Sequence, residues 1–559
     1  MPDHKLPQTS ALDQQTQAFP TLTPAQIERA RQFATSRKVA VGDILFEVGD
    51  TRVPMFILLS GRMEVVQPSV GAERPVAQHG PGEFTGETNM ISGRRSLVRG
   101  RVTEAGEILE ISPENLRSLI AKDAELSEVF MRAFILRRLV LIAEGLGDVV
   151  LLGSRHSAGT LRLREFLARN GHPYTYVDLD TDQQAQELLD RFSVSVADVP
   201  VLICRGSNVL RNPSVQEVAE CLGLNNPVDE SQVRDLVIVG AGPSGLAAAV
   251  YGASEGLNVL VIETSAPGGQ AGSSSKIENY LGFPVGVSGA ELAARALNQA
   301  QKFGAEMMIA HGVVRLHCGR KPYQIELDNG KKVTTRTIVI ATGAQYNKPA
   351  IPNLAKFEGL GVYYGATFIE AQLCEQEEVI VVGGGNSAGQ AAVYLSQSAR
   401  RVHILVRSGQ LSDTMSRYLI QRIEENPKIT LHYHTEIVAL EGDDHLERVR
   451  WRDRATSAEE TKSMRHVFLM TGAVPNTKWL EGCLALDSKG FILTGQDLKA
   501  DSTDDAHWMA ARPPYLLETS MPGVFAVGDA RAGNVKRVAS AVGEGSISVH
   551  LVHRVLAEM

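Results

Sequence analysis

Short apolar runs and longer apolar–polar repeats alternate along the chain, and the change from one pattern to the other marks its parts. Between Arg37 and Val66 the apolar runs are short and are separated by Gly-Asp turns, which predicts a small β-roll or jelly roll. At 114–145 apolar side chains recur every three or four positions, which predicts helices. Residues 1–19 are polar and predict a disordered leader.

The next part, residues 148–226, alternates apolar runs of strand length with amphipathic stretches of helix length. Strands are predicted at 149–153, 174–180 and 199–204, and helices at 158–170, 182–192 and 213–222. The order β-α-β-α-β-α is typical of a small α/β domain.

The third part opens on an aliphatic run, Leu236 to Val239, which predicts a buried parallel strand followed by a glycine-rich turn and an Ala-rich helix. Gly240 allows the tight turn, Gly242 lets the backbone approach a pyrophosphate, and Gly245 lets the helix pack closely on the strand. A second predicted strand ends in Glu263, where a carboxylate accepts hydrogen bonds from a ribose diol. The combination predicts a dinucleotide site, and a glycine-rich turn without nucleotide is the alternative.

A second apolar run, residues 379–382, is followed by another glycine-rich turn with an alanine at the third glycine position, which predicts a second dinucleotide fold. Its candidate contacts are Gly383, Gly385, Asn386, Ser387 and Ala388. Arg407 ends the next strand, where an acid selects NAD and an arginine suits the 2′-phosphate of NADP. This favours NADPH over NADH, and a solvated surface arginine is the alternative.

Composition limits the remaining choices. At 559 residues the chain is too long for one hydrophobic core, so several domains are expected. A net charge of −8 argues against a general nucleic-acid or membrane-surface binder. Residues 236–253 lack charge, but their glycines and proline predict a strand, turn and helix rather than a membrane span. No export signal is evident at the N-terminus.

The five cysteines lie far apart, at 204, 221, 318, 374 and 483, and none forms a C-x-x-C motif. This spacing excludes a sequence-local zinc site or redox dithiol, so no metal is expected, and it fits a reducing cytoplasm. Cys204 and Cys221 are interpreted as buried apolar fillers.

A candidate anion site lies at 81–96, where a Gly-Glu pair opens a short turn that is followed by arginine and serine. Arginine and turn amides together can hold one phosphate. The segment resembles the cyclic nucleotide-binding domain, and the resemblance implies that Glu87, beside Gly86, holds a ribose hydroxyl, Arg95 the cyclic phosphate, and Ser96 the phosphate or base edge. The Glu-to-Arg spacing is shorter than in those relatives, so a roll that has lost its nucleotide is the alternative. No helix-turn-helix follows, and DNA binding is not predicted.

Residues 148–226 resemble glutaredoxin and other thioredoxin-fold domains, with Val199-Pro200 at the position of their cis-proline. The corner that carries C-x-x-C in that family is Ser154-Arg155-His156-Ser157 here. Without a thiolate there is no disulfide exchange. The domain is therefore interpreted as a redox-silent spacer or docking module, with a substrate-binding remnant as the alternative.

Residues 231–559 resemble the low-molecular-weight thioredoxin reductases, because two nucleotide folds, an Ala-Thr-Gly turn and a late Gly-Asp motif occur in the family's order. The resemblance implies FAD on the first fold, NAD(P)H on the second, and a homodimer. The implied FAD contacts are Gly240, Gly242, Gly245, Glu263, Gly269, Gln270, Asn279, Thr342, Gly343, Asp529, Arg537 and Val538.

The predicted fold class is thus multidomain: an N-terminal β-roll with helices, a thioredoxin-like α/β domain, and two Rossmann-like α/β domains. The expected boundaries are a leader at 1–19, the roll at 20–147, the thioredoxin-like domain at 148–226, the FAD domain at 231–348 and 476–559, and the NAD(P)H domain at 349–475.

One departure from the reductases bears on activity. Gly365 and Phe368 stand where the family has its C-x-x-C, and Cys374 lies in a different register and is interpreted as structural. The sequence therefore predicts a cytoplasmic FAD-dependent NAD(P)H oxidoreductase that passes electrons to an external acceptor: a small redox protein, a quinone or oxygen. The first domain is expected to regulate it by binding a cyclic nucleotide. The alternatives are ferredoxin/flavodoxin–NADP reductase-like activity and a non-catalytic sensor, while thioredoxin-disulfide reductase activity is disfavoured.

Overall fold

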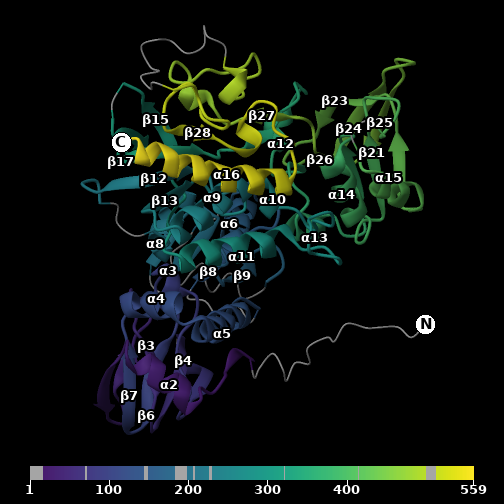
Figure 1. The fold of residues 1–559 in the computed structure, drawn as a ribbon. Coiled ribbons are helices and arrows are strands. Elements are labelled where there is room, and N and C mark those ends of the chain that lie inside the picture. The colour runs from purple at the N-terminus through teal and green to yellow at the C-terminus, as the bar shows by residue number, and fades with distance from the viewer. Residues whose placement is uncertain are drawn as a thin grey trace, which may run out of the picture.

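The computed structural model in Figure 1 has the roll at one end, the two nucleotide folds at the other, and a small α/β unit between them. It describes residues 17–69, 72–143, 149–182, 195, 198–204, 208–225, 229–319, 321–412, 415–498 and 512–559. Nearly all of the predicted leader and of the predicted helix at 182–192 lie outside the described residues.

The roll consists of two antiparallel sheets, β1-β7-β3 and β2-β6-β4-β5, covered by helices. Phe130 and Phe134 of α5 pack against Phe84 of the roll. Their ring centroids lie 4.8 and 6.2 Å from that of Phe84, so the long helix belongs to the roll's core. The elements are α2 (Pro24–Arg31), β1 (Thr35–Val39), β2 (Ile44–Phe46), β3 (Met55–Leu58), β4 (Arg62–Ser69), β5 (Ala72–His79), α3 (Asn89–Ser92), β6 (Arg99–Glu104), β7 (Gly106–Ile111), α4 (Pro113–Lys122) and α5 (Ala124–Ala143). The predicted roll and helices are confirmed.

The middle unit has a four-stranded sheet in the order β11-β10-β8-β9, in which β8 pairs parallel with β9 and antiparallel with β10. The Val199–Pro200 bond is cis, as the thioredoxin-fold resemblance implies. Strand β11 is an addition to the predicted order. The elements are β8 (Val149–Gly153), α6 (Ala158–Arg169), β9 (Thr175–Asp178), β10 (Val201–Cys204), β11 (Asn208–Arg211) and α8 (Val215–Leu222).

The first nucleotide fold is built on the sheet β14-β13-β12-β17-β16-β15, and β28, from near the C-terminus, pairs parallel with β17. Its first part has β12 (Val233–Val239), α9 (Pro243–Ser254), β13 (Val259–Glu263), α10 (Gly269–Gly272), α11 (Gly289–Lys302), β14 (Glu306–Ile309), β15 (Val313–His317), β16 (Tyr323–Leu327) and β17 (Lys332–Ile340). Its second part has η2 (Lys478–Leu480), η3 (Gly495–Asp497), β28 (Val524–Ala526), η5 (Gly528–Ala530) and α16 (Val538–Ala557).

The uncharged stretch 236–253 forms most of β12 and α9, as predicted. Among the described residues, no helix combines the length and the apolarity that a membrane crossing requires.

The second nucleotide fold is inserted between these two parts, and the antiparallel pair β18 (Ala344–Tyr346) and β27 (Ala473–Pro475) carries the chain out and back. Its parallel sheet has the order β19-β26-β20-β21-β22, beside a small sheet β23-β24-β25. The elements are α12 (Leu354–Phe357), β19 (Val362–Tyr363), α13 (Phe368–Leu373), β20 (Glu378–Val382), α14 (Asn386–Leu395), β21 (Arg401–Leu405), α15 (Arg417–Glu424), β22 (Ile429–His432), β23 (Thr435–Glu441), β24 (Arg448–Asp453), β25 (Glu459–Ser463) and β26 (His466–Leu469).

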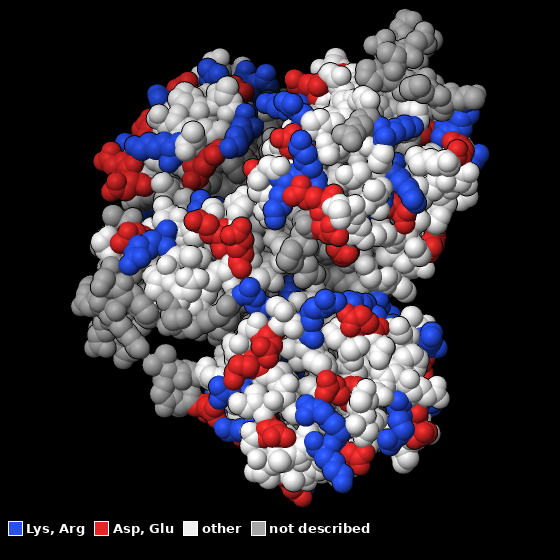
Figure 2. All heavy atoms as spheres, turned by 90° about the vertical axis from the view of Figure 1, so that its left-hand side faces the viewer, with Lys and Arg blue, Asp and Glu red and all other residues white. Residues whose placement is uncertain are grey.

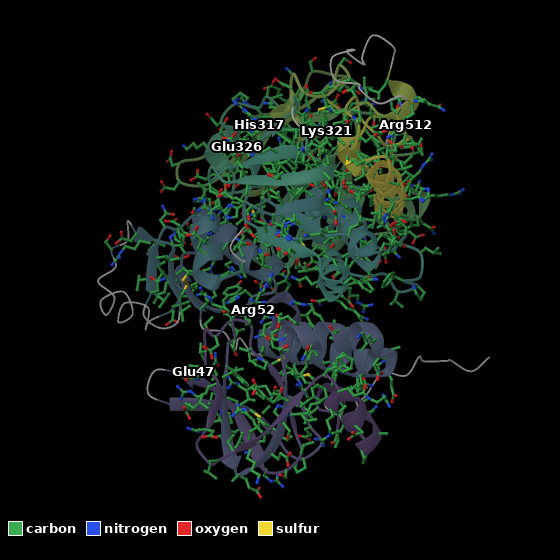
Figure 3. All side chains as sticks on the ribbon, turned by 60° about the vertical axis from the view of Figure 1, so that its left-hand side comes forward. Glu47, Arg52, His317, Lys321, Glu326 and Arg512 are labelled. Carbon is green, nitrogen blue, oxygen red and sulfur yellow. A yellow bond between two sulfur atoms is a disulfide. The ribbon has the colours of Figure 1, made fainter. Side chains whose placement is uncertain are left out.

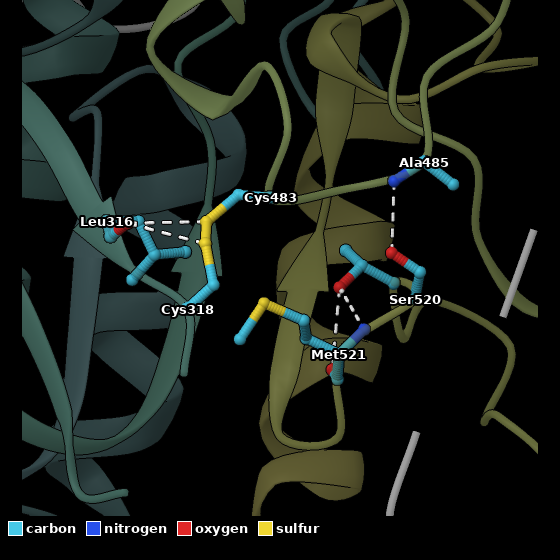
Figure 4. The surroundings of a disulfide bond; sticks show 7 residues. Leu316, Cys318, Cys483, Ala485, Ser520 and Met521 are labelled. Carbon is cyan, nitrogen blue, oxygen red and sulfur yellow. Dashed lines mark hydrogen bonds between the residues drawn. A yellow bond between two sulfur atoms is a disulfide. The ribbon is translucent and has the colours of Figure 1, made fainter. Parts of the chain in front are cut away.

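Four cysteines are paired, which corrects the interpretation of Cys204 and Cys221 as separate fillers. Cys204 ends β10 and Cys221 lies on α8. Because this helix packs on the sheet, the two side chains lie close together, and they form a disulfide. A second disulfide links Cys318, after β15, with Cys483, after η2, although 165 residues separate them in sequence. Figure 4 shows both sulfurs beside the carbonyl oxygen of Leu316. The spacing of the cysteines therefore no longer argues for a reducing compartment.

Charged side chains of both signs are interspersed over the face drawn in Figure 2. Figure 3 marks examples at the two ends of the molecule. Glu47 of the roll pairs with Arg99 at 2.8 Å. At the far end His317 of β15 lies 3.3 Å from Glu326 of β16, and Arg512 lies 2.6 Å from the buried Glu518.

Candidate functional site

The turn between β12 and α9 has the geometry that a dinucleotide fingerprint requires. Gly240 has φ +103°, a conformation that suits glycine. A Cβ on Gly245 would lie 1.9 Å from the Gly240 carbonyl oxygen, so only glycine permits this approach of helix to turn. Gly242 is different, because the nearest heavy atom to a Cβ there would be 4.0 Å away. Protein packing thus leaves space beside Gly242, at the N-terminus of α9, where helix amides favour a phosphate.

Glu263, at the end of β13, holds the same turn together. Its carboxylate accepts hydrogen bonds from the backbone N–H of Ala241 at 2.8 Å and of Ser265 at 2.9 Å. Glu263, the residue predicted to bind the ribose, thus lies beside the turn and also fixes the shape of the turn.

The start of α10 and the loop before it close over the turn. Gly269, the first residue of α10, approaches so nearly that a Cβ there would lie 3.0 Å from the Cα of Gly242. Gln270 donates a hydrogen bond to the Ala344 carbonyl, where the chain leaves for the second fold. This segment is fixed from outside by Arg169 of α6, whose guanidinium donates to the Gly269 carbonyl at 2.8 Å. Sequence reasoning missed Arg169, because no local motif marks a contact between domains.

The C-terminal part packs against the start of α9. A Cβ on Gly545 of α16 would lie 2.2 Å from the Ser244 carbonyl oxygen, so the interior of α16 packs tightly on α9. A Cβ on Gly528 would lie 2.6 Å from Oγ of Ser244, so η5, which contains Asp529, lies beside the start of α9. Arg537 caps α16 and Val538 is its first residue. Burial raises the pKa of Asp529, and nearby Lys536 partly offsets this.

Thr342 and Gly343 complete the arrangement at the carboxyl end of β17. The Thr342 hydroxyl is buried without a hydrogen-bond partner among the described residues. Asn476, the residue after β27, donates to the Thr342 carbonyl at 3.0 Å and fixes this turn. The N-terminus of α9, an orphaned hydroxyl and the half-buried carboxylate of Asp529 fit the FAD that the resemblance implies. Asn279 is exposed, next to the ion pair of Glu278 with Arg422 of α15.

The second fold repeats the turn. Gly383 has φ +145°, and a Cβ on it would lie 2.5 Å from the Met470 carbonyl oxygen. Gly385 caps α14, Ala388 is buried, and Ser387 is exposed at the helix start. The Asn386 side chain accepts a hydrogen bond from the Ser416 N–H at 2.7 Å. Arg407 is exposed just beyond β21, so its guanidinium is accessible from solvent.

The positions of the missing dithiol lie at the start of α13. Gly365 has open space around it, and Phe368 is 66% exposed. Cys374 is fully buried, its thiol donates to the Glu370 carbonyl at 2.8 Å, and burial raises its pKa. A thiol in this state is a poor nucleophile at neutral pH.

Helix α6 of the middle unit packs beside these positions. Leu161 of α6 shares a buried cluster with Tyr363, Ala366 and Ile369. A Cβ on Gly359 would lie 2.8 Å from the Cβ of Ala158, the first residue of α6. The first turns of α6, which follow the cysteine-less corner, therefore pack beside the cysteine-less start of α13.

In the roll, the structure brings Gly86, Glu87 and Ser96 to the wall of a cavity of about 590 Å³ beneath α5. Arg95 does not line it. A Cβ on Gly223, at the end of α8, would lie 2.5 Å from Nε of Arg95, so this side chain lies against the middle unit.

Arginines also join the roll to the middle unit. Arg94 donates to the Asn170 carbonyl at 3.0 Å, and Arg138 of α5 donates to the Gly171 carbonyl at 2.8 Å. Arg138 also lies 3.3 Å from the carboxylate of Glu87 in the cavity wall. The Asn170 amide in turn donates to the Ser265 carbonyl at 3.2 Å, so these contacts reach the loop before α10.

Comparisons with known proteins agree with these folds. The model of the pyridine nucleotide-disulphide oxidoreductases matches residues 234–545, and that of the cyclic nucleotide-binding domain matches residues 36–123. The chain is 30% identical to a thioredoxin reductase of Bacillus subtilis, over 59% of this chain and 98% of that one.

Two further relatives show the same extent of similarity. The NADPH-dependent thioredoxin reductase 3 of Arabidopsis thaliana is 31% identical over 63% of this chain, which spans 65% of that relative's length. The crystal structure of Lactococcus lactis thioredoxin reductase matches with a TM-score of 0.52 and 27% identity, covering 58% of this chain and 100% of that one.

Proposed function

The chain belongs to the pyridine nucleotide-disulphide oxidoreductases, a family of FAD-dependent NAD(P)H oxidoreductases, and we propose from this premise that it transfers electrons from NADPH to a small molecule rather than to a protein disulfide. When bound, FAD accepts a hydride from the nicotinamide and releases the electron pair to an acceptor. For a quinone the balance is NADPH, a proton and the quinone giving NADP⁺ and the hydroquinone.

The observation that carries the proposal is the convergence at the N-terminus of α9. Residues around 242, 269, 342 and 529 meet there although they are far apart in sequence. The amides at the N-terminus of α9 would hold the pyrophosphate, and the segment at Gly269 would lie beside it. Asp529, whose pKa is raised by burial, would accept hydrogen bonds from cofactor hydroxyls.

The acceptor class follows from the surroundings of α13. A relay to a protein disulfide needs two thiols, and Gly365 and Phe368 supply none. A quinone or oxygen needs only access to the flavin, so small acceptors are favoured over a small redox protein.

An anaerobic titration tests the enzymatic reading. One equivalent of NADPH should bleach the flavin absorbance of the purified protein, and a benzoquinone or oxygen should restore it, whereas oxidised thioredoxin should not. Cys374→Ala should leave the rate of each step unchanged, because the buried thiol has no part in it. A flavin that stays oxidised under NADPH contradicts the proposal and leaves a non-catalytic sensor. Electron transfer to oxidised thioredoxin that Cys374→Ala abolishes contradicts the acceptor class.

The preference for NADPH is proposed from Arg407 and supported by the NADPH-dependent relative from Arabidopsis. Arg407→Gln should raise the KM for NADPH about tenfold, equivalent to about 1.4 kcal/mol, and leave the KM for NADH unchanged. Stopped-flow flavin reduction with each nucleotide measures both. Arg401→Gln, at the exposed start of the same strand, is the matched control. Equal effects on the two nucleotides would count against a 2′-phosphate contact.

Regulation by the roll is proposed from the contacts between Glu87, Arg138, the end of α6 and the loop at Gly269. A ligand that competes for Glu87 would disturb this route and change the hydride step. The measurement is NADPH turnover with and without a cyclic nucleotide, in the wild type and in Arg95→Ala. It tests whether a cyclic nucleotide regulates turnover and whether Arg95, which the resemblance assigns to the cyclic phosphate, takes part. A homodimer in the cytoplasm is also proposed, to be tested by sedimentation and cell fractionation.

A further inference from the structure

The cavity beneath α5 has predominantly apolar walls, to which Glu87 and Arg137 add charged side chains. Phe46 and Val65 of the roll and Leu136, Leu139 and Val140 of α5 contribute to the apolar part. Its volume of about 590 Å³ lies within the range of small-ligand sites. Such a cavity favours a ligand with a sizeable apolar body.

The polar groups that the family resemblance assigns to a cyclic nucleotide are engaged elsewhere. The Glu87 carboxylate pairs with Arg138, and the Ser96 hydroxyl donates to the Val98 carbonyl at 2.8 Å. Arg95 lies against Gly223, outside the cavity wall. The groups expected to hold the sugar and the cyclic phosphate are therefore committed to protein contacts.

Arg137 of α5 supplies a different cation at the cavity. The residue is 7% exposed, and its guanidinium donates to the carbonyls of Ala18 at 2.8 Å and Gly86 at 2.9 Å. It lies between the rings of Phe19 and Phe84, 4.9 and 4.7 Å from their centroids. Its Nη2 has no hydrogen-bond partner among the described residues, and neither has the side-chain oxygen of Asn89, which lines the same cavity.

A buried guanidinium without a bonded anion is costly. Burial lowers the pKa of Arg137 to about 9, with Glu83 opposing the shift, and the group stays protonated at neutral pH. Glu83 accepts from the Gly80 N–H and lies 3.7 Å from His79, and the structure gives it no hydrogen bond to Arg137. One anionic group at Nη2 would supply both the missing acceptor and the missing charge.

We propose that this cavity binds an apolar organic anion, with a single carboxylate or similar group on Arg137 and its carbon body along α5, in place of a cyclic nucleotide. This inference rests on the proposed function in one respect, which is that the roll is taken as the regulatory domain. Binding of the anion to the cavity requires neither flavin nor turnover.

Octanoate and octanol provide a matched pair of probes, because they share one alkyl chain and differ in charge. Calorimetric titration of the full-length wild-type protein should show octanoate binding at least ~10-fold tighter than octanol. Arg137→Gln should abolish this preference, and Arg95→Gln should retain it. Equal affinities of the wild-type protein for octanoate and octanol would overturn the proposal. This comparison needs no variant, so it remains decisive even if Arg137→Gln does not fold.

Cyclic AMP serves as the opposing ligand. It should not displace octanoate at concentrations that saturate cyclic-nucleotide proteins, and tight binding of cyclic AMP that Arg95→Gln removes would overturn the proposal. NADPH oxidation measured in the same preparations separates the two questions. Octanoate binding with no turnover refutes only the enzymatic function, and turnover without charge-dependent binding refutes only the ligand class.

Discussion

Gly242→Ala should yield a folded protein that purifies without flavin colour. The structure leaves 4.0 Å between a Cβ at this position and the nearest heavy atom, and the backbone angles of Gly242 (φ −70°, ψ −177°) are open to alanine. The methyl group would instead occupy the space that the pyrophosphate needs at the N-terminus of α9. We expect FAD to bind ~100-fold more weakly, equivalent to about 2.7 kcal/mol. The ratio of flavin to protein absorbance and a titration of the apoprotein with FAD measure this.

Gly80→Ala in the roll is the matched control, because it makes the same chemical change with no heavy atom within 4 Å and no positive φ. Both variants should keep the unfolding temperature of the wild-type apoprotein, and only Gly242→Ala should lose FAD. Normal flavin content in Gly242→Ala would mean that the pyrophosphate does not lie at this turn.

Replacing Cys318 and Cys483 together by serine should cause the largest loss of stability among the changes considered. Their disulfide joins the two parts of the first nucleotide fold and closes a span of 165 residues. Because the entropy that a cross-link removes from the unfolded chain grows with the length of the loop, its loss should cost about 2–5 kcal/mol, toward the upper end. The urea midpoint of the flavin domain, followed by flavin fluorescence, should fall accordingly in the absence of reductant.

A thiol count supplies the accompanying control. The denatured, unreduced wild type should present one reactive thiol, from Cys374, out of five cysteines. Excess reductant, which opens both disulfides, should raise the count to five, and the wild type and the double serine variant should then have the same midpoint when both are measured under that reductant. Five thiols without reductant would refute the pairing, and an unchanged midpoint would refute its contribution to stability.

The parts of the molecule that depend on local sequence could be predicted from it. The turns at Gly240 and Gly383 follow from residues within one strand–turn–helix unit, whose spacing is fixed by backbone geometry. The strands of the roll and helix α5 could also be predicted, because the spacing of apolar residues within each element indicates its type. What the sequence could not show are contacts across large separations. Arg169 bonding to the loop at Gly269 and Cys318 pairing with Cys483 carry no local signature.

The cavity of the roll shows a subtler limit. A motif predicts residue types at a site, but it cannot show whether their side chains turn inward. Glu87 and Ser96 do line the cavity, whereas Arg95 turns toward Gly223 because a neighbouring domain is present there. Arg137 reaches the cavity from α5, a helix whose apolar periodicity indicated only core packing.

Helix α6 has a mechanical consequence. Its first turn packs against Gly359 and α13 of the second nucleotide fold. At its last turn, Arg169 donates a hydrogen bond to the Gly269 carbonyl of the first nucleotide fold. The only covalent links between those folds that the structure describes are the strands β18 and β27. A rotation of one fold about these strands would therefore have to break the contacts of α6 at one of its ends.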